Sequence, residues 1–219
     1  MKIELPNSWH GVTLREFQEV TALLKEAKEK RETLPEKKRN QFDFETECVL
    51  ISTLSGVSID DIMQLHRGAH NSLMNQLGFL SSPVDGGLKK RVRVNGNRYY
   101  FETNARKITG GQWVSLMHFL EDEEKIDENL HNLLGCFANR LKWHEFKGKH
   151  NGKIHKDVAA DMQALPITTV KPLTDFFLSD WLNYAMNIAR FSEYAAKGLK
   201  RLAELRLKLS SRNTDGSTR

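Results

Sequence analysis

The stretch Arg91-Val-Arg-Val-Asn-Gly-Asn-Arg-Tyr-Tyr-Phe-Glu-Thr103 carries the clearest β signal in a chain whose other patterns are helical. Two runs of β-branched and aromatic residues flank Asn95 and Gly96, the dipeptide that best tolerates the positive φ angles of a type I′ turn. The stretch therefore predicts a two-stranded hairpin over about residues 90–102. Because an isolated hairpin is only marginally stable in water, we expect it to pack on helices or on another chain.

Helical periodicity and capping residues cover most of the remaining chain. Thr13 and Glu16 have the Thr-x-x-Glu spacing of a capping box, which predicts a helix start. The charged stretch that follows, residues 25–39, contains Pro35 and is predicted to be an exposed helix end plus a loop. Further helices are predicted at about residues 43–55 before Gly56, from Ser58, from Thr109, at 126–140, at 155–164 and at 173–209.

These patterns predict an α+β fold that is mainly α-helical, with a central two-stranded β-hairpin and a long C-terminal helix. We divide the chain into a helical domain with the hairpin at residues 1–170, a long helix or helical pair at 171–209, and a disordered tail at 210–219. One unbroken helix from Thr174 to Leu209, which is 36 residues, would be about 54 Å long at about 1.5 Å per residue, and this length exceeds the width of a domain of this size.

Composition places the chain among ordinary globular proteins. It has 219 residues, of which 39% are hydrophobic and 28% are charged. No apolar run approaches the roughly 20 residues that span a bilayer, and the N-terminus lacks the apolar core of a signal peptide, so we expect no membrane partner. Cys48 and Cys136 each lie in an apolar helical pattern, which predicts buried free thiols in a reducing compartment.

The net charge of +5 is distributed unevenly. Residues 1–141 hold 19 Lys and Arg against 20 Asp and Glu, whereas residues 142–219 hold 14 against 8. A second, local excess lies on the hairpin, where Glu102 is the only acidic residue near a group of cations. These cations are Lys89, Lys90, Arg91, Arg93, Arg98, Arg106 and Lys107. A solvated surface is one interpretation of this excess, and an anionic partner is the other.

No pattern of catalytic, cofactor-binding or metal-ligating residues is legible. His66 and His70 are four apart, as zinc ligands on a helix can be, but no second pair supports them and Gly68 weakens the helix between them. The phosphate-binding glycine motifs and the nucleophile elbow are also missing. We therefore expect neither an enzyme nor a cofactor, and a small metal-dependent enzyme is the least favoured alternative.

Candidate binding residues fall into two groups. In the hairpin, strand alternation places Tyr99 and Phe101 on one face and Arg98 with Tyr100 on the other, so one aromatic row is expected to pack on helices. Arg91 and Arg93 share a face and are free to meet an anion. In the C-terminal helix, aromatic residues seven apart and a leucine seam suit helix association. The predicted partner-binding residues are Arg91, Arg93, Arg98, Phe177, Tyr184, Phe191, Leu199, Leu202, Leu205 and Leu209.

The order of motifs resembles that of small proteins encoded among the structural and assembly genes of tailed bacteriophages. The likeness covers roughly residues 5–180 and carries no catalytic signature. Its most characteristic piece is Val94-Asn-Gly-Asn-Arg-Tyr-Tyr100 leading to Ile108-Thr-Gly-Gly-Gln-Trp113. The other pieces are Leu5-Pro-Asn-Ser-Trp9, Thr13-Leu-Arg-Glu-Phe17, Leu54-Ser-Gly-Val-Ser-Ile-Asp-Asp-Ile62, Asn129-Leu-His-Asn-Leu-Leu134, and Leu165-Pro166 before Phe176-Phe177. The basic stretch 142–156 and the long C-terminal helix depart from the pattern.

The resemblance implies a non-enzymatic phage morphogenesis protein, similar to tail assembly chaperones or minor virion components. It implies other phage structural proteins as partners, membership in an oligomer or larger assembly, and a location in the host cytoplasm during assembly, with the virion as a second location. A nucleic-acid-associated basic virion protein is the alternative, because arginines and aromatic residues interleave in the hairpin. The resemblance carries over no functional residue.

Overall fold

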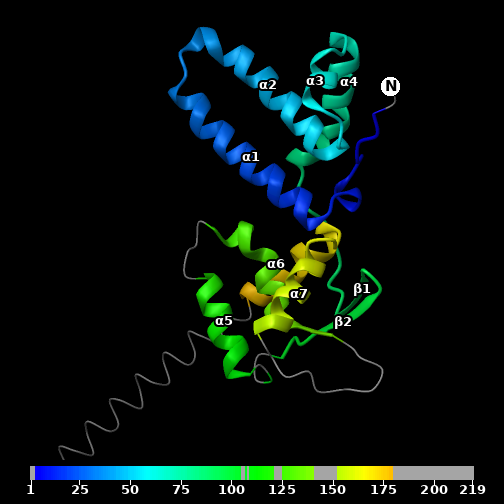
Figure 1. Cartoon of the computed structure of the whole chain (residues 1–219), viewed down its shortest axis with the longest axis vertical. Helices are drawn as coiled ribbons and strands as arrows, with labels where there is room; N and C mark the ends of the chain where they lie inside the picture. Colours follow the sequence, from blue (N-terminus) through cyan, green and yellow to red (C-terminus); the bar gives the residue numbers. More distant parts are fainter. Residues whose placement is uncertain (1–2, 105–106, 108, 121–124, 141–151, 180–219) are drawn as a thin grey trace, which may run out of the picture. The chain divides into compact units, whose positions relative to one another are not determined.

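The fold is mostly helical with a small antiparallel sheet, which confirms the predicted fold class (Figure 1). A computed structural model describes residues 3–104, 107, 109–120, 125–140 and 152–179. The chain separates into two compact units, Met1–Phe176 and Phe177–Arg219, and the fold described below is that of the first. The domain boundaries predicted from the sequence stay predictions, since residues 180–219 lie outside the described part.

The described part of the chain begins with helices only, and its three strands all lie after residue 90. In chain order they are η1 (Trp9–Gly11), α1 (Leu14–Thr33), α2 (Glu36–Ser55), α3 (Ile59–Met63), α4 (Arg67–Gln76), η2 (Leu77–Ser81), β1 (Arg91–Val94), β2 (Asn97–Phe101), α5 (Gly110–Leu120), α6 (Ile126–Phe137), β3 (Ala138–Arg140) and α7 (Gly152–Met162). A further helix covers residues 167–179. Among the described helices, none combines the length and the apolar character that crossing a membrane requires.

Helix α1 begins at the predicted capping box. The Glu16 main-chain N–H donates to Thr13 Oγ1 at 3.3 Å, and the Thr13 N–H donates to Glu16 Oε2 at 2.7 Å. The prediction of a loop within residues 25–39 is wrong, because α1 continues to Thr33 and α2 begins at Glu36. Only Leu34 and Pro35 break the helices, since a residue before proline favours extended backbone and charged helix formers continue on both sides.

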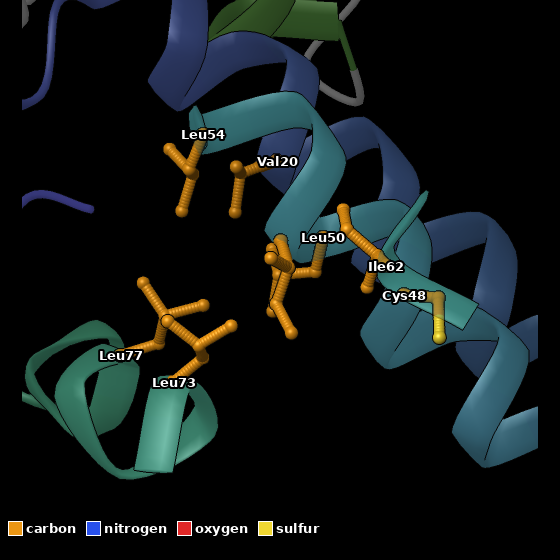
Figure 2. Packing of buried hydrophobic residues seen from close by; sticks show 8 residues of the cluster. Val20, Cys48, Leu50, Leu54, Ile62, Leu73 and Leu77 are labelled. Carbon is orange, nitrogen blue, oxygen red and sulfur yellow. The ribbon is translucent and has the colours of Figure 1, made fainter. Parts of the chain in front are cut away.

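The first hydrophobic core lies between α1, α2, α3 and α4, which pack as an antiparallel helix pair with two short helices beside it. Gly56 ends α2 with a φ of 70°, and the Ser58 side chain caps α3, as predicted. Figure 2 shows Leu73 and Leu77 on one side of this core and Leu54 with Val20 on the other. The buried cluster comprises Val20, Cys48, Leu50, Ile51, Leu54, Ile62, Leu73 and Leu77.

The sheet has three strands, in the order β1-β2-β3, so the prediction of a two-stranded hairpin was incomplete. The predicted helix 126–140 ends at Phe137, and residues 138–140 form β3, which pairs antiparallel with β2. The heptad-like apolar pattern of α6 could not reveal this change, because β3 is a strand only through its pairing with a partner about 40 residues away in sequence. Helix α6 packs against α5, α7 and α1.

Reciprocal hydrogen bonds join the start of α1 to the segment after α7. Helix N-termini leave main-chain N–H groups without partners inside the helix. The Leu14 N–H donates to Leu165 O at 2.8 Å, and the Arg15 N–H donates to Gln163 O at 3.0 Å. In return, the Ile167 N–H, at the start of helix 167–179, donates to Val12 O at 2.9 Å. Main-chain N–H groups at the start of each helix are thus hydrogen-bonded to carbonyl groups of the chain that precedes the other helix.

The final described helix begins six residues earlier than the sequence predicted. Pro166 O accepts the Thr169 and Val170 N–H groups, so Pro172 lies inside the helix and not at its start. A proline there has no N–H for the carbonyl four residues earlier, which is that of Thr168. The chain leading to β1 crosses at this point, and a Cβ built on Gly86 would lie 1.9 Å from Thr168 O.

This close approach predicts that Gly86→Ala destabilises the fold by about 2 kcal/mol, because either the helix or the crossing chain must shift. Gly87→Ala is the matched control: a Cβ on Gly87 meets nothing within 4 Å, so its effect should stay within about 0.5 kcal/mol. Urea unfolding followed by circular dichroism measures both. Equal stabilities of the two variants would contradict the crossing at Thr168.

Candidate functional site

The hairpin turn has the predicted geometry. Asn95 has a φ of 47° and Gly96 a φ of 76°, the two positive angles that a type I′ turn requires. The turn sets the register, in which Arg93 lies opposite Arg98 and Arg91 lies opposite Tyr100. The predicted bounds of about 90–102 agree with β1 and β2.

Strand alternation separates the hairpin into two faces. Val94, Tyr99 and Phe101 are buried, which confirms that one aromatic row packs inward. Arg91, Arg93 and Arg98 are all exposed and share the opposite face. We call these three arginines the basic face of the hairpin.

Two of these arginines, Arg93 and Arg98, lie directly opposite one another. The Phe101 N–H donates to Lys90 O at 2.9 Å, so hydrogen-bonded pairs fall at alternate positions and Arg93 with Arg98 forms a non-hydrogen-bonded pair. In such pairs the Cα atoms are only about 4.5 Å apart, and like charges directly opposite are destabilising. The basic face therefore carries an electrostatic cost in the isolated chain.

No described acidic residue offsets that cost. Within the described ranges, none of the three arginines forms an ion pair. Asp85 and Glu102 are the nearest acidic residues in sequence, and Glu102 accepts the main-chain N–H of Asn104 at 3.0 Å. Lys89, Lys90 and Lys107 are exposed and extend the positive charge beyond the strands. This arrangement can bind an anionic surface without first breaking an internal salt bridge.

One carboxylate anchors the hairpin to the helices. Asp161 on α7 accepts hydrogen bonds from Asn95 Nδ2 at 2.9 Å, from Asn97 Nδ2 at 2.7 Å and from the Tyr99 hydroxyl. Its partners thus include both the turn and the central strand. Sequence reasoning missed Asp161, because a single acidic residue more than 60 positions away carries no local signal of this role.

The other predicted binding residues lie in the C-terminal region. Phe177 is described and is buried, with 4% of its surface exposed, and its role in partner binding stays a prediction. The remaining six fall outside the described residues: Tyr184, Phe191, Leu199, Leu202, Leu205 and Leu209.

The two histidines with metal-ligand spacing do not converge. His66 is the exposed N-cap residue of α4, whereas His70 is 3% exposed and faces the first core. His70 Nε2 lies 3.9 Å from Cys48 Sγ, and its Nδ1 lies 3.8 Å from a Glu47 oxygen. One metal ion cannot bind both nitrogens of a single ring. Across the described parts of the chain, no three metal-ligating side chains gather.

Both cysteines are buried and free, as predicted. Burial, together with the negative charges of Glu47 and Glu45, raises the pKa of the Cys48 thiol. Burial alone raises the pKa of Cys136 to about 12. Because the thiolate is the reactive form, the raised pKa disfavours reaction at both thiols.

Removing the anchoring carboxylate should loosen the hairpin. Asp161→Ala leaves the buried Tyr99 hydroxyl without this acceptor, and we expect a loss of about 2 kcal/mol of unfolding free energy. Asp157→Ala removes the same charge from an exposed position one turn earlier on α7 and should change stability by less than about 0.5 kcal/mol. Amide NMR shifts of residues 95–99 should move only in the first variant. If both variants behave alike, Asp161 does not anchor the hairpin.

Thiol labelling tests the buried environment of the cysteines. At pH 8, an exposed thiol with a pKa of about 8.5 is roughly one quarter ionised, whereas a thiol with a pKa of about 12 is ionised about one part in ten thousand. We therefore expect Cys136 in the native chain to resist an aromatic disulfide reagent for hours and to react within minutes in guanidinium chloride. Rapid labelling of the native chain, located by peptide mass mapping, would contradict this burial.

Comparison with known proteins identifies no relative of this chain. No protein-family model, no curated protein and no solved structure matches the chain.

Proposed function

We propose that this chain is a non-enzymatic morphogenesis protein of a tailed bacteriophage, which binds other virion or tail proteins through the basic face of its hairpin. It acts in the host cytoplasm during assembly, as a tail assembly chaperone or as a minor structural component. The observation that carries the proposal is the basic face itself: three exposed arginines without an ion pair among the described residues, held on an anchored strand pair.

The energetic argument supports binding over a purely structural role. A solvated cation elsewhere on the surface costs little, but Arg93 and Arg98 repel one another directly. An acidic partner would remove this repulsion and form charge-assisted hydrogen bonds with the guanidinium groups. The repulsion that destabilises the free chain is thus replaced by attraction to the partner in the complex.

The likeness of residues 5–180 to small phage assembly proteins supplies the biological setting of the proposal. A non-catalytic role is supported by Asp161, which serves as an anchor, and by the burial that raises the pKa of the Cys48 thiol.

A nucleic-acid-associated virion protein is the second candidate. Tyr100 lies on the same face as the arginines and is partly exposed, so the face combines cations with an aromatic ring. That combination suits phosphate contacts and base stacking. Salt weakens arginine contacts with carboxylates as well as with phosphates, so sensitivity to nuclease is the property that separates the two candidates.

Replacing Arg91, Arg93 and Arg98 together with Gln should reduce capture of virion or tail proteins from infected cells about tenfold, because the charge-assisted contacts are lost. Quantitative mass spectrometry of material bound to the tagged full chain measures this loss. The control changes Lys25, Lys28 and Lys37, three exposed lysines of α1 and α2, to Gln and should leave capture unchanged.

Three results would contradict the proposal: equal capture by both triple variants, capture of no virion or tail protein by the unaltered chain, or capture abolished by nuclease treatment. The last result would favour the nucleic-acid candidate. Circular dichroism establishes that both triple variants are folded before capture is compared.

A further inference from the structure

Among the residues that the structure describes, strand β1 is an open edge of the sheet. The strand order is β1-β2-β3, so β1 has a neighbour on one side only, as Figure 1 also shows for the described chain. The bond from the Phe101 N–H to Lys90 O fixes which residues of β1 direct their main-chain groups toward β2. By alternation, the N–H and C=O groups of Arg91 and Arg93 point away from the sheet.

These outward main-chain groups belong to the residues of the basic face. Within the described residues, neither Arg91 nor Arg93 forms a hydrogen bond on its outward side. An open edge with unpaired main-chain groups is a template for an added strand. Main-chain pairing and arginine contacts are therefore available to one and the same partner segment.

The spacing of the arginines defines what that segment carries. Arg91 and Arg93 are two residues apart on one strand, or about 6.8 Å at about 3.4 Å per residue. An added strand has the same spacing between its own alternate residues, so two acidic side chains at positions i and i+2 would lie beside the two arginines. The intervening residue would lie on the other face, beside partly buried Val92, where an apolar side chain is favoured.

The same charges disfavour pairing between two copies of this edge. If β1 paired antiparallel with β1 of a second chain, arginines would lie beside arginines, and like charges across strands are destabilising. Nucleic acid would meet the guanidinium groups but could not form the strand-like ladder with the outward N–H and C=O groups. The combination of edge and charge therefore selects an extended acidic polypeptide.

We propose that the β1 edge binds an extended segment of a partner protein in which acidic residues alternate with apolar ones, and that this segment adds a fourth strand to the sheet. This inference rests on the proposed function and specifies its binding mode. Arg98, opposite Arg93, contributes a further contact to an acidic side chain on the same face.

The test uses the full chain, labelled with nitrogen-15, and the probe peptide acetyl-Thr-Glu-Val-Glu-Val-Glu-Thr-amide. We expect amide shifts concentrated at Arg91–Val94 and an affinity about tenfold higher than that of the block peptide acetyl-Thr-Thr-Val-Val-Glu-Glu-Glu-amide, which has the same composition. The double variant Arg91→Gln, Arg93→Gln should lose about tenfold in affinity, while Lys25→Gln, Lys28→Gln should lose nothing.

Two N-methylated forms of the probe separate strand addition from simple charge attraction. One is methylated on the glutamates and the other on the valines, so in either strand direction one of them removes the N–H groups that face β1. We expect that form to lose about tenfold in affinity and the other to bind as before. The net charge of the peptide is the same in all forms.

Equal binding of the alternating and block peptides would overturn the inference, as would full affinity of both methylated forms. A single-stranded oligothymidylate that shifts residues 91–98 when the alternating peptide does not would also overturn it. These failures are distinguishable from failure of the proposed function, which depends on whether the triple arginine variant loses capture of phage proteins. Loss of capture together with charge-only peptide binding would retain the function and remove the strand addition.

Discussion

The carboxylate of Asp161 is the constraint on which the hairpin depends. A two-stranded hairpin has too little buried surface to hold its shape in water, and here the turn and the central strand both donate hydrogen bonds to this one group. The position of Asp161 is fixed in turn by α7, whose following segment exchanges hydrogen bonds with the start of α1. The order of the basic face thus derives from helices far away in sequence.

An anchored hairpin can hold charges that a free one would separate. Arg93 and Arg98 face one another across the strands, and their repulsion acts against the pairing that the turn and Asp161 enforce. Such a cost is consistent with a surface whose lowest energy is reached in a complex. The arginines also protect the exposed strand edge from pairing with a second copy of the chain, because a row of arginines repels the same row in the other copy.

The helical body combines two cores with different roles. The core of α1–α4 is apolar apart from His70, whose ring lies beside Phe44 and Cys48, and it holds the long antiparallel helix pair together. The buried residues of β2, α6 and α7 instead support the sheet, with Phe101, Leu134 and Met162 fully enclosed. Gln112 contributes a polar link there, since its Oε1 accepts the Thr109 N–H at the start of α5 and its Nε2 donates to Cys136 O.

The sequence by itself determined the features that depend on a few neighbouring residues. The type I′ turn at Asn95 and Gly96, the caps at Thr13 and Ser58, and the two faces of the hairpin follow from local backbone preferences and strand alternation. Tertiary structure decided what depends on distant partners. Residues 138–140 form a strand because they pair with the free side of β2. Pro172 lies within a helix because packing outweighs the loss of one helical hydrogen bond. The proposed binding face follows the same division: strand alternation places the arginines on one side, whereas the anchoring by Asp161 and the position of β1 at the edge of the described sheet depend on tertiary structure.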